Sequence, residues 1–254
     1  MGSLIYKVGE QMQIKLNCDM GESFGIWKIG LDEEIMPYVD MANLACGFHA
    51  SDANTMSKSV KLASKHGVTI GAHPGYQDLV GFGRRSMACT SEEITSFVLY
   101  QMGALNAFCI ANNTKFTYVK PHGALYNDMM KNEMIFRAIL KAIVSFDKNL
   151  KLMILSTANN ETNEKIAQEF NIELLYEVFA DRNYNDDGTL VSRTQDNAVI
   201  HDVNTVLKRI ETLKEEGYLI SHLEKKLHLK ADAICVHGDN HEALEFIKTL
   251  RGCL

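Results

Sequence analysis

Several signatures of common protein classes are missing from this chain of 254 residues. It has no unbroken run of about 18 apolar residues, so we expect no membrane-spanning segment and no membrane partner. Its first residues, MGSLIYKVGEQMQ, lack the apolar block of a signal peptide, which predicts a cytoplasmic protein. Its six cysteines form no C-x-x-C pair, and we expect all of them to be reduced, with only Cys46 considered as a nucleophile.

Short catalytic fingerprints are also absent. There is no G-x-x-x-x-G-K-[ST], so a nucleotide would not be held by a P-loop, and there is no G-x-S-x-G or H-E-x-x-H. The net charge of −6, with both signs interspersed, argues against nucleic acid as the main partner, because phosphate binding needs a basic face.

Short apolar runs alternate with helix-like stretches along the chain. The predicted strands, each ending in a polar or glycine-rich turn, cover residues 14–17, 41–46, 68–71, 116–120, 152–155, 173–179 and 233–236. The predicted helices cover residues 52–66, 91–111, 132–146, 160–170, 196–216 and 241–250.

This alternation predicts an α/β fold with a mostly parallel sheet and helices outside it. Seven units favour a seven-stranded, TIM-like β/α barrel, and a doubly wound open sheet is the competing layout. No linker-like segment or shift in composition divides the chain, so we expect residues 1–254 to form a single domain.

Four loops place a histidine beside glycine just past a predicted strand: ACGFHASD (45–52), GAHPGY (71–76), KPHGALYN (120–127) and VHGDN (236–240). In α/β folds, active sites are built at the carboxyl ends of the strands. The sequence therefore predicts one cleft formed by these loops. His49 also precedes a helix start, which suits an anion, although it could equally be a histidine of the cap region.

Two further segments supply charge. The loop after the first strand carries Asp19 and Glu22, which could do acid–base work, hold a cation or merely cap a helix. Lys120 stands at a strand end, where burial would lower its pKa and make it a base or a stabiliser of charge.

The segment DRNYNDDGTLVSRTQ (181–195) contains an Asp–Gly turn that suggests a projecting arm. Glu177, Asp181, Arg182 and Arg193 surround it, either as site residues or as a solvated charge cluster. The pair Arg84–Arg85 follows two glycines and could bind a carboxylate or phosphate, or form surface ion pairs.

Taken together, six ordered motifs resemble those of the LamB/YcsF family: LNCDMGESFG, ANLACGFHASD, GAHPGYQDLVGFGRR, VKPHGALYN, EVFADRNYNDDGTLVSR and ICVHGDN. The resemblance runs from about Ile14 to Leu250. One departure is His241, where the family more often has proline, and the first dozen residues precede the family's usual start.

The resemblance implies a barrel of the glycoside hydrolase/deacetylase type and a hydrolase activity. The chain would be the A subunit of an ATP-dependent 5-oxoprolinase, which opens the lactam of 5-oxoproline (pyroglutamate) to L-glutamate together with partner subunits B and C. ATP is the implied cofactor. The sequence assigns no metal ligands and leaves a requirement for a divalent cation open.

Positions that match the family motifs become the candidate site residues. Those expected to be catalytic are Asp19, Glu22, His73, Lys120 and His122. Those expected to bind substrate are Asn17, Asn43, His49, Glu177, Arg182, Arg193, His237 and Asp239. Lactam hydrolysis driven by phosphorylation of the amide oxygen needs cations, a base and proton carriers, which lysine and arginine, the carboxylates and the histidines could supply.

Two other functions are compatible with the same residues. A metal-dependent hydrolase or deacetylase on this barrel could bind zinc through His49, His73 or His237, but the H-x-x-x-H loop expected in such deacetylases is missing. A third hypothesis is a chemically passive protein that presents a small acid to a partner.

Overall fold

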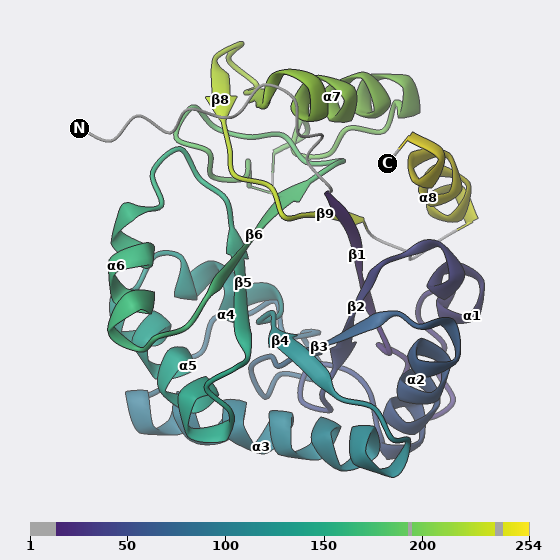
Figure 1. Cartoon of the computed structure of the whole chain (residues 1–254), viewed down its shortest axis with the longest axis vertical. Helices are drawn as coiled ribbons and strands as arrows, with labels where there is room; N and C mark the ends of the chain where they lie inside the picture. Colours follow the sequence, from purple (N-terminus) through teal and green to yellow (C-terminus); the bar gives the residue numbers. More distant parts are fainter. Residues whose placement is uncertain (1–13, 193–194, 237–240, 254) are drawn as a thin grey trace.

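The computed structural model describes residues 14–192, 195–236 and 241–253. Within these residues, seven parallel strands close into a barrel in the order β1-β2-β3-β4-β5-β6-β9, with β9 hydrogen-bonded to β1 (Figure 1). The strands are β1 (Lys15–Met20), β2 (Met41–Ala45), β3 (Thr69–His73), β4 (Phe116–Val119), β5 (Lys151–Leu155), β6 (Leu174–Phe179) and β9 (Ala233–Val236). The predicted seven-stranded α/β barrel is confirmed, and the open-sheet alternative is wrong.

Helices surround the barrel (Figure 1). They are α1 (Asp32–Ile35), the 3₁₀ turn η1 (Met36–Tyr38), α2 (Ala53–His66), α3 (Ser91–Ala111), α4 (Gly123–Met129), α5 (Glu133–Phe146), α6 (Glu161–Glu169), α7 (Val203–Glu216) and α8 (His241–Cys253). Between α7 and β9, β7 (Tyr218–Ile220) and β8 (Lys226–His228) form an antiparallel hairpin. The sequence did not predict α1, α4 or this hairpin, because they are only a few residues long.

Two predicted boundaries are wrong in ways that have a physical cause. The helix expected from residue 196 begins after Asp202, whose carboxylate accepts a hydrogen bond from the Thr205 amide and so starts α7 there. The first strand continues to Met20 rather than ending at Asn17, because it pairs with β2 along this stretch. Asp19 therefore belongs to a strand and not to a loop.

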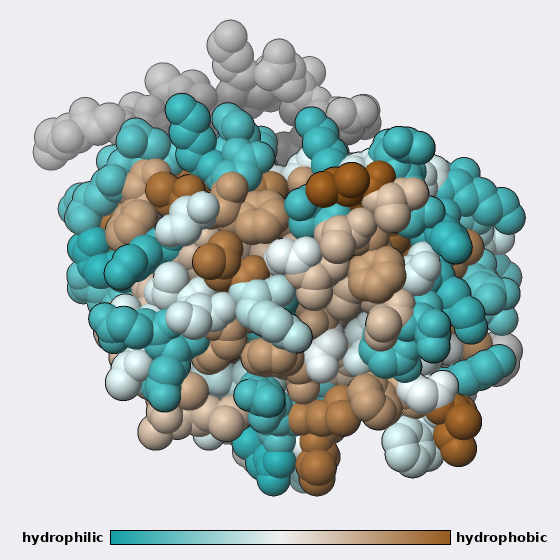
Figure 2. Space-filling view, turned by 90° about the horizontal axis from the view of Figure 1, so that it is seen from below, coloured by the Kyte–Doolittle hydropathy of each residue, from teal (hydrophilic) through white to brown (hydrophobic). Residues whose placement is uncertain are grey.

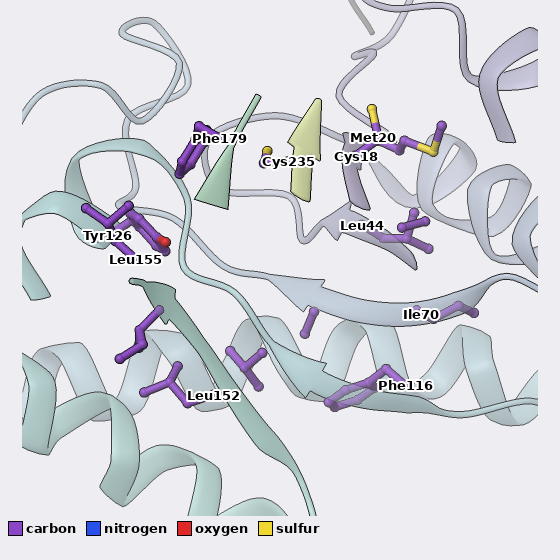
Figure 3. Close-up of a cluster of buried hydrophobic side chains, with 14 of the residues drawn as sticks. Cys18, Met20, Leu44, Ile70, Phe116, Tyr126, Leu152, Leu155, Phe179 and Cys235 are labelled. Atoms are coloured by element: carbon purple, nitrogen blue, oxygen red, sulfur yellow. The ribbon is translucent and has the colours of Figure 1, made fainter. Parts of the chain in front are cut away.

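The strands separate two kinds of core. Alternate residues pack outward against the helices, among them Leu44, Ile70 and Leu152 (Figure 3). Inside the barrel, Met41, Tyr118, Met153 and Ala233 form a smaller apolar cluster, with Leu175 packed against it. Several of these inner residues lie near the starts of their strands, so the apolar cluster fills that half of the barrel. The carboxyl-terminal half is left for polar side chains.

The apolar character of α3 differs from expectation. An 18-residue window of this helix has a mean hydropathy of 1.4, so by length and composition α3 alone among the described helices could span a membrane. The expectation that no segment would qualify is therefore wrong. One side of α3 packs on the core through Val98, Met102 and Leu105, and core helices of globular folds pass the same test. Figure 2 shows apolar side chains gathered on the opposite, outer face.

Asp52 joins the loops that follow β1 and β2. One carboxylate oxygen accepts hydrogen bonds from the amides of Asn54 (2.8 Å) and Thr55 (3.0 Å) and caps α2. The other oxygen accepts one from the Gly25 amide at 2.7 Å. These bonds, that of Gly25 foremost, lower the pKa of Asp52. One exposed carboxylate thus fixes two loops that carry site residues.

We predict that Asp52→Ala lowers the free energy of unfolding by about 1 kcal/mol at pH 7, a typical cost of losing a cap. Because the pKa of Asp52 is lower in the folded state, its charge stabilises the fold above the unfolded pKa, and this contribution is lost as the pH falls through the folded value. Urea unfolding at several pH values checks this. The difference in the free energy of unfolding between the native chain and Asp52→Asn should become smaller in acid. The control is Glu211→Gln, which changes an exposed glutamate. A difference that does not change with pH would contradict the prediction.

Candidate functional site

A cavity of about 230 Å³ opens at the carboxyl ends of the strands. The five residues expected to be catalytic all line it: Asp19, Glu22, His73, Lys120 and His122. They come from β1, β3, β4 and the loops that follow β1 and β4. The expected convergence of these side chains at one end of the barrel is therefore observed, while their individual roles stay predictions.

Lys120 lies at the centre of the polar half of the barrel and is only 3% exposed. Its ammonium group is 2.8 Å from Asp19 Oδ1 and 2.7 Å from Glu177 Oε1. A third neighbour is the sulfur of Cys235 at 3.3 Å. One buried carboxylate, Glu177, and one partly buried carboxylate, Asp19, thus share one buried cation, which compensates charges that would otherwise be costly to remove from water.

This arrangement corrects the expected protonation of Lys120. Burial by itself favours the neutral amine, but the negative charges, led by Asp19 and including Glu177, outweigh it and raise the pKa of Lys120 well above its ordinary value. The lysine is therefore an ammonium ion at neutral pH. It can stabilise charge and orient carboxylates, but it cannot serve as a base.

A chain of amide hydrogen bonds supports this group from below. The side-chain amide of Asn43 donates to Asn17 Oδ1 and to Asp19 Oδ1, both at 2.7 Å. The Tyr118 hydroxyl donates to Asn43 Oδ1 at 2.6 Å. Asn17 and Asn43 are fully buried, and Asn43 connects Asn17 to Asp19. Their expected contact with the substrate stays a prediction.

Three histidines and one glutamate form a second cluster beside Asp19. His73 Nε2 is 3.0 Å from His122 Nδ1, and Glu22 Oε1 is 3.6 Å from the same His122 atom and 3.5 Å from His49 Nε2. One ligand atom from each of the four residues lies within 4.8 Å of all the others. The sequence assigned no metal ligands, yet these residues together could hold a metal ion.

Two of these histidines, His49 and His122, are buried and neutral. Burial, followed by the influence of His73, lowers the pKa of His49 well below its usual value. Burial, followed by His49 and His73, does the same for His122. The rings of His49 and His122 stack in parallel at 3.7 Å. Neither ring nitrogen of His49 has a hydrogen-bond partner among the described residues, which is unusual for a fully buried histidine.

Two glycines make room for this cluster. A Cβ atom on Gly75 would lie 2.6 Å from His49 Nδ1. A Cβ atom on Gly83 would lie 2.6 Å from His49 Cβ and 2.8 Å from His122 Cδ2, and Gly83 also has a φ of +63°. The motifs GAHPGY and GFGRR therefore need glycine at these two positions so that their loops can close over the imidazoles.

Glu177 and Arg182 are not solvated charges. Glu177 is fully buried, and its second oxygen accepts a hydrogen bond from the Tyr126 hydroxyl at 2.9 Å. Arg182 is buried as well and donates to the backbone carbonyls of Val191 (2.7 Å) and Ala198 (3.2 Å). Arg182 also lines the cavity, so its expected contact with the substrate stays a prediction.

The segment expected to project as an arm is instead packed against the barrel. Tyr184 is fully buried, and its hydroxyl accepts a hydrogen bond from the Phe179 amide at 2.8 Å. The apolar surface of this tyrosine draws the segment inward. Three other candidates, Arg193, His237 and Asp239, lie outside the described residues.

The sequence did not single out Tyr126, although it lines the cavity, whereas Arg84, which lines it as well, belongs to the arginine pair noted as a possible anion ligand. Tyr126 follows Lys120 within the motif KPHGALYN and reaches Glu177 from the first turns of α4, a short helix that apolar periodicity cannot reveal. The arginine pair divides: Arg85 binds Asp78, whereas Arg84 lies over the ring of Phe82 and faces the cavity.

The cysteines do not provide a nucleophile. The five cysteines whose side chains the structure describes are free, in agreement with the predicted reduced state: Cys18, Cys46, Cys89, Cys109 and Cys235. Burial raises the pKa of the Cys46 thiol to about 12, so it is not a thiolate at neutral pH. The idea of Cys46 as a nucleophile is therefore wrong.

Known proteins are similar to this chain over nearly its whole length. A protein of Vibrio campbellii, named as the A subunit of 5-oxoprolinase, is 52% identical over 242 residues, which cover 95% of this chain and 96% of that protein. A Pseudomonas fluorescens protein of the same name is 48% identical over 95% of this chain and 97% of its own length. The crystal structure of a lactam utilization protein from Thermus thermophilus matches with a TM-score of 0.89 and 39% identity, and covers 96% of both chains.

The family profile agrees with these individual matches. The profile of the LamB/YcsF family matches residues 14–254, a range that holds every strand of the barrel and every candidate site residue. The family profile covers most of the chain, and relatives near 50% identity align with it over nearly the full length of both proteins. We conclude that the chain belongs to the LamB/YcsF family.

Proposed function

We propose that this chain is the A subunit of an ATP-dependent 5-oxoprolinase, which hydrolyses the lactam of 5-oxoproline to L-glutamate. The observation that carries the proposal is the name shared by relatives of about 50% identity over nearly the full length of both chains. The relative of known structure, a lactam utilization protein, supports the same substrate class. A cavity of about 230 Å³ suits a small ring, being below the range of about 300–1,000 Å³ common for drug-sized ligands.

Asp19 is the group best arranged to act as the base. Its Oδ1 is held by Lys120 at 2.8 Å, and its Oδ2 lies 3.4 Å from His73 Nε2 at the cavity wall. We propose that Asp19 accepts a proton from water as the water oxygen attacks the lactam carbonyl carbon. The same proton then passes to the ring nitrogen as the carbon–nitrogen bond breaks, which yields the amine of glutamate.

Lys120 and Glu177 would act by holding Asp19 in place. All three hydrogens of the ammonium have an acceptor nearby, so the lysine fixes the position of the base rather than reaching for substrate. Arg84 also lines the cavity, and unlike Lys120 and Arg182 it is not buried in the protein interior. We propose that its guanidinium group binds the carboxylate of the substrate.

ATP would be handled by the partner subunits. The described cavity offers no cradle for a triphosphate, because Lys120 is neutralised by two carboxylates and Arg182 is bound to backbone carbonyls. We therefore infer that subunits B and C use ATP to phosphorylate the amide oxygen of the lactam, whose amide otherwise resists hydrolysis. In this chain's site, water attacks the activated carbon and the carbon–nitrogen bond breaks, and the acyl phosphate so formed is hydrolysed to glutamate and phosphate. Since the substrate is activated with ATP, we expect the assembly in the cytoplasm.

The test is reconstitution. The purified chain should release no glutamate from 5-oxoproline by itself, and should do so in the presence of subunits B and C only when ATP is added. Glutamate release by the isolated chain without ATP would favour a self-contained metal-dependent hydrolase. An assembly of the three subunits that releases no glutamate would refute the proposal.

We predict that Asp19→Asn lowers kcat of the assembly by at least about 100-fold, the usual contribution of a general base, while substrate binding persists. Glutamate release and calorimetric binding of 5-oxoproline check the two parts separately. The matched control is Asp147→Asn, which changes an aspartate at the end of α5, far in sequence from the cavity motifs. Loss of binding in step with turnover would instead support a passive protein that only presents the substrate.

We predict that Lys120→Met lowers the free energy of unfolding by about 3–5 kcal/mol, because the buried Glu177 and the partly buried Asp19 lose their shared cation. Adding Glu177→Gln should recover part of this loss by removing one of the charges. The control Lys151→Met breaks a half-exposed pair with Glu173 and should cost under about 1 kcal/mol. Equal losses for the two lysines in denaturant unfolding would contradict the account.

A further inference from the structure

Two imidazole nitrogens face each other at 3.0 Å in the cavity wall, and the outer contacts of each ring fix its tautomer. His73 Nδ1 lies 2.6 Å from the carbonyl oxygen of Lys120, and His122 Nε2 lies 2.8 Å from that of Phe82. A carbonyl oxygen can only accept a hydrogen bond, so each of these nitrogens carries the ring hydrogen. A neutral imidazole carries one ring hydrogen, so if both rings are neutral, His73 Nε2 and His122 Nδ1 each present a lone pair to the other.

Two lone pairs at this distance repel unless a positive centre lies beside them. The groups nearest to this pair are two carboxylates, which have no hydrogen to donate when ionised: Asp19 Oδ2 is 3.4 Å from His73 Nε2, and Glu22 Oε1 is 3.6 Å from His122 Nδ1. The imidazole of His49 lies beside Glu22, with Nε2 3.5 Å from Oε1. His49 is fully buried and makes no hydrogen bond through either nitrogen among the described residues. A fully buried imidazole without such a bond is what a ligand-binding histidine presents when the ligand supplies its polar contact.

The spacing of the four groups fits a metal of one size class. Bonds of about 2.0–2.1 Å in a tetrahedral zinc site place neighbouring ligand atoms about 3.3 Å apart. Three separations between ligand atoms in this cluster are 3.0, 3.5 and 3.6 Å. The parallel ring of His49 would have to tilt away from His122 to complete the set, and no hydrogen bond to a described residue holds this ring in its present orientation.

We propose that Glu22, His49, His73 and His122 form a binding site for one divalent transition-metal ion of the zinc type. Three imidazoles and one carboxylate select Zn²⁺, Co²⁺ or Mn²⁺ over Mg²⁺ and Ca²⁺, which prefer oxygen ligands throughout. The backbone carbonyls that hold His73 and His122 act as the outer groups that orient metal-binding histidines. This site goes beyond the proposed function and does not depend on it.

The experiment titrates Zn²⁺ and, separately, Co²⁺ into the untagged full chain after chelation and dialysis. Calorimetry gives affinity and stoichiometry, and the visible absorption of Co²⁺ reports nitrogen and oxygen ligands. We expect one ion per chain, a higher Tm on adding Zn²⁺, and at least about tenfold weaker binding in Glu22→Gln. Glu22 is on a partly exposed loop, so this variant should fold, and circular dichroism checks that it does.

The control is His66→Gln, which removes an exposed histidine at the end of α2 and should leave binding unchanged. His73→Gln should weaken binding as Glu22→Gln does. The proposal is overturned if no stoichiometric binding occurs, or if Glu22→Gln and His66→Gln bind the metal equally well. It is also overturned if the imidazole NMR resonances of His73 and His122 do not change when one equivalent of Zn²⁺ is added, since the ion would then not bind between these rings.

Discussion

The ion triad of Asp19, Lys120 and Glu177 is the interaction on which the site depends. It connects β1, the end of β4 and β6, which are not neighbours in the barrel, through one ammonium group. A buried charge is tolerated only when it is paired, so each member requires the others. The apolar cluster in the other half of the barrel leaves the polar half as a single connected network.

Asp19 links this triad to the histidine cluster. One of its oxygens binds Lys120, and the other lies beside His73. The cluster itself is built at the ends of β1, β2, β3 and β4 and in the loops that follow them, which are consecutive around the barrel. A wall of three imidazoles and one carboxylate therefore stands next to the ion triad at the cavity. Because these two groups differ in this way, one cavity is compatible with both the proposed lactam hydrolysis and the proposed metal site.

The sequence predicted the barrel because its strands are short, apolar and separated by clear turns. It could also predict which residues meet, since parallel strands align their carboxyl ends. It could not predict the pKa of Lys120, because the direction depends on two carboxylates that reach it from distant strands. Nor could it show that Arg182 turns inward or that Tyr126 contacts Glu177, since both depend on the packing of short segments.

The charge state of Lys120 tests the central claim most directly. NMR of the chain with ¹⁵N-labelled lysine can follow the Nζ resonance of Lys120, assigned by comparison with Lys120→Met, as the pH rises. The account predicts that Lys120 is still an ammonium ion above about pH 10.4, the ordinary lysine value, while the exposed lysines titrate there. An amine that loses its proton near neutral pH would show that the two carboxylates do not share its charge.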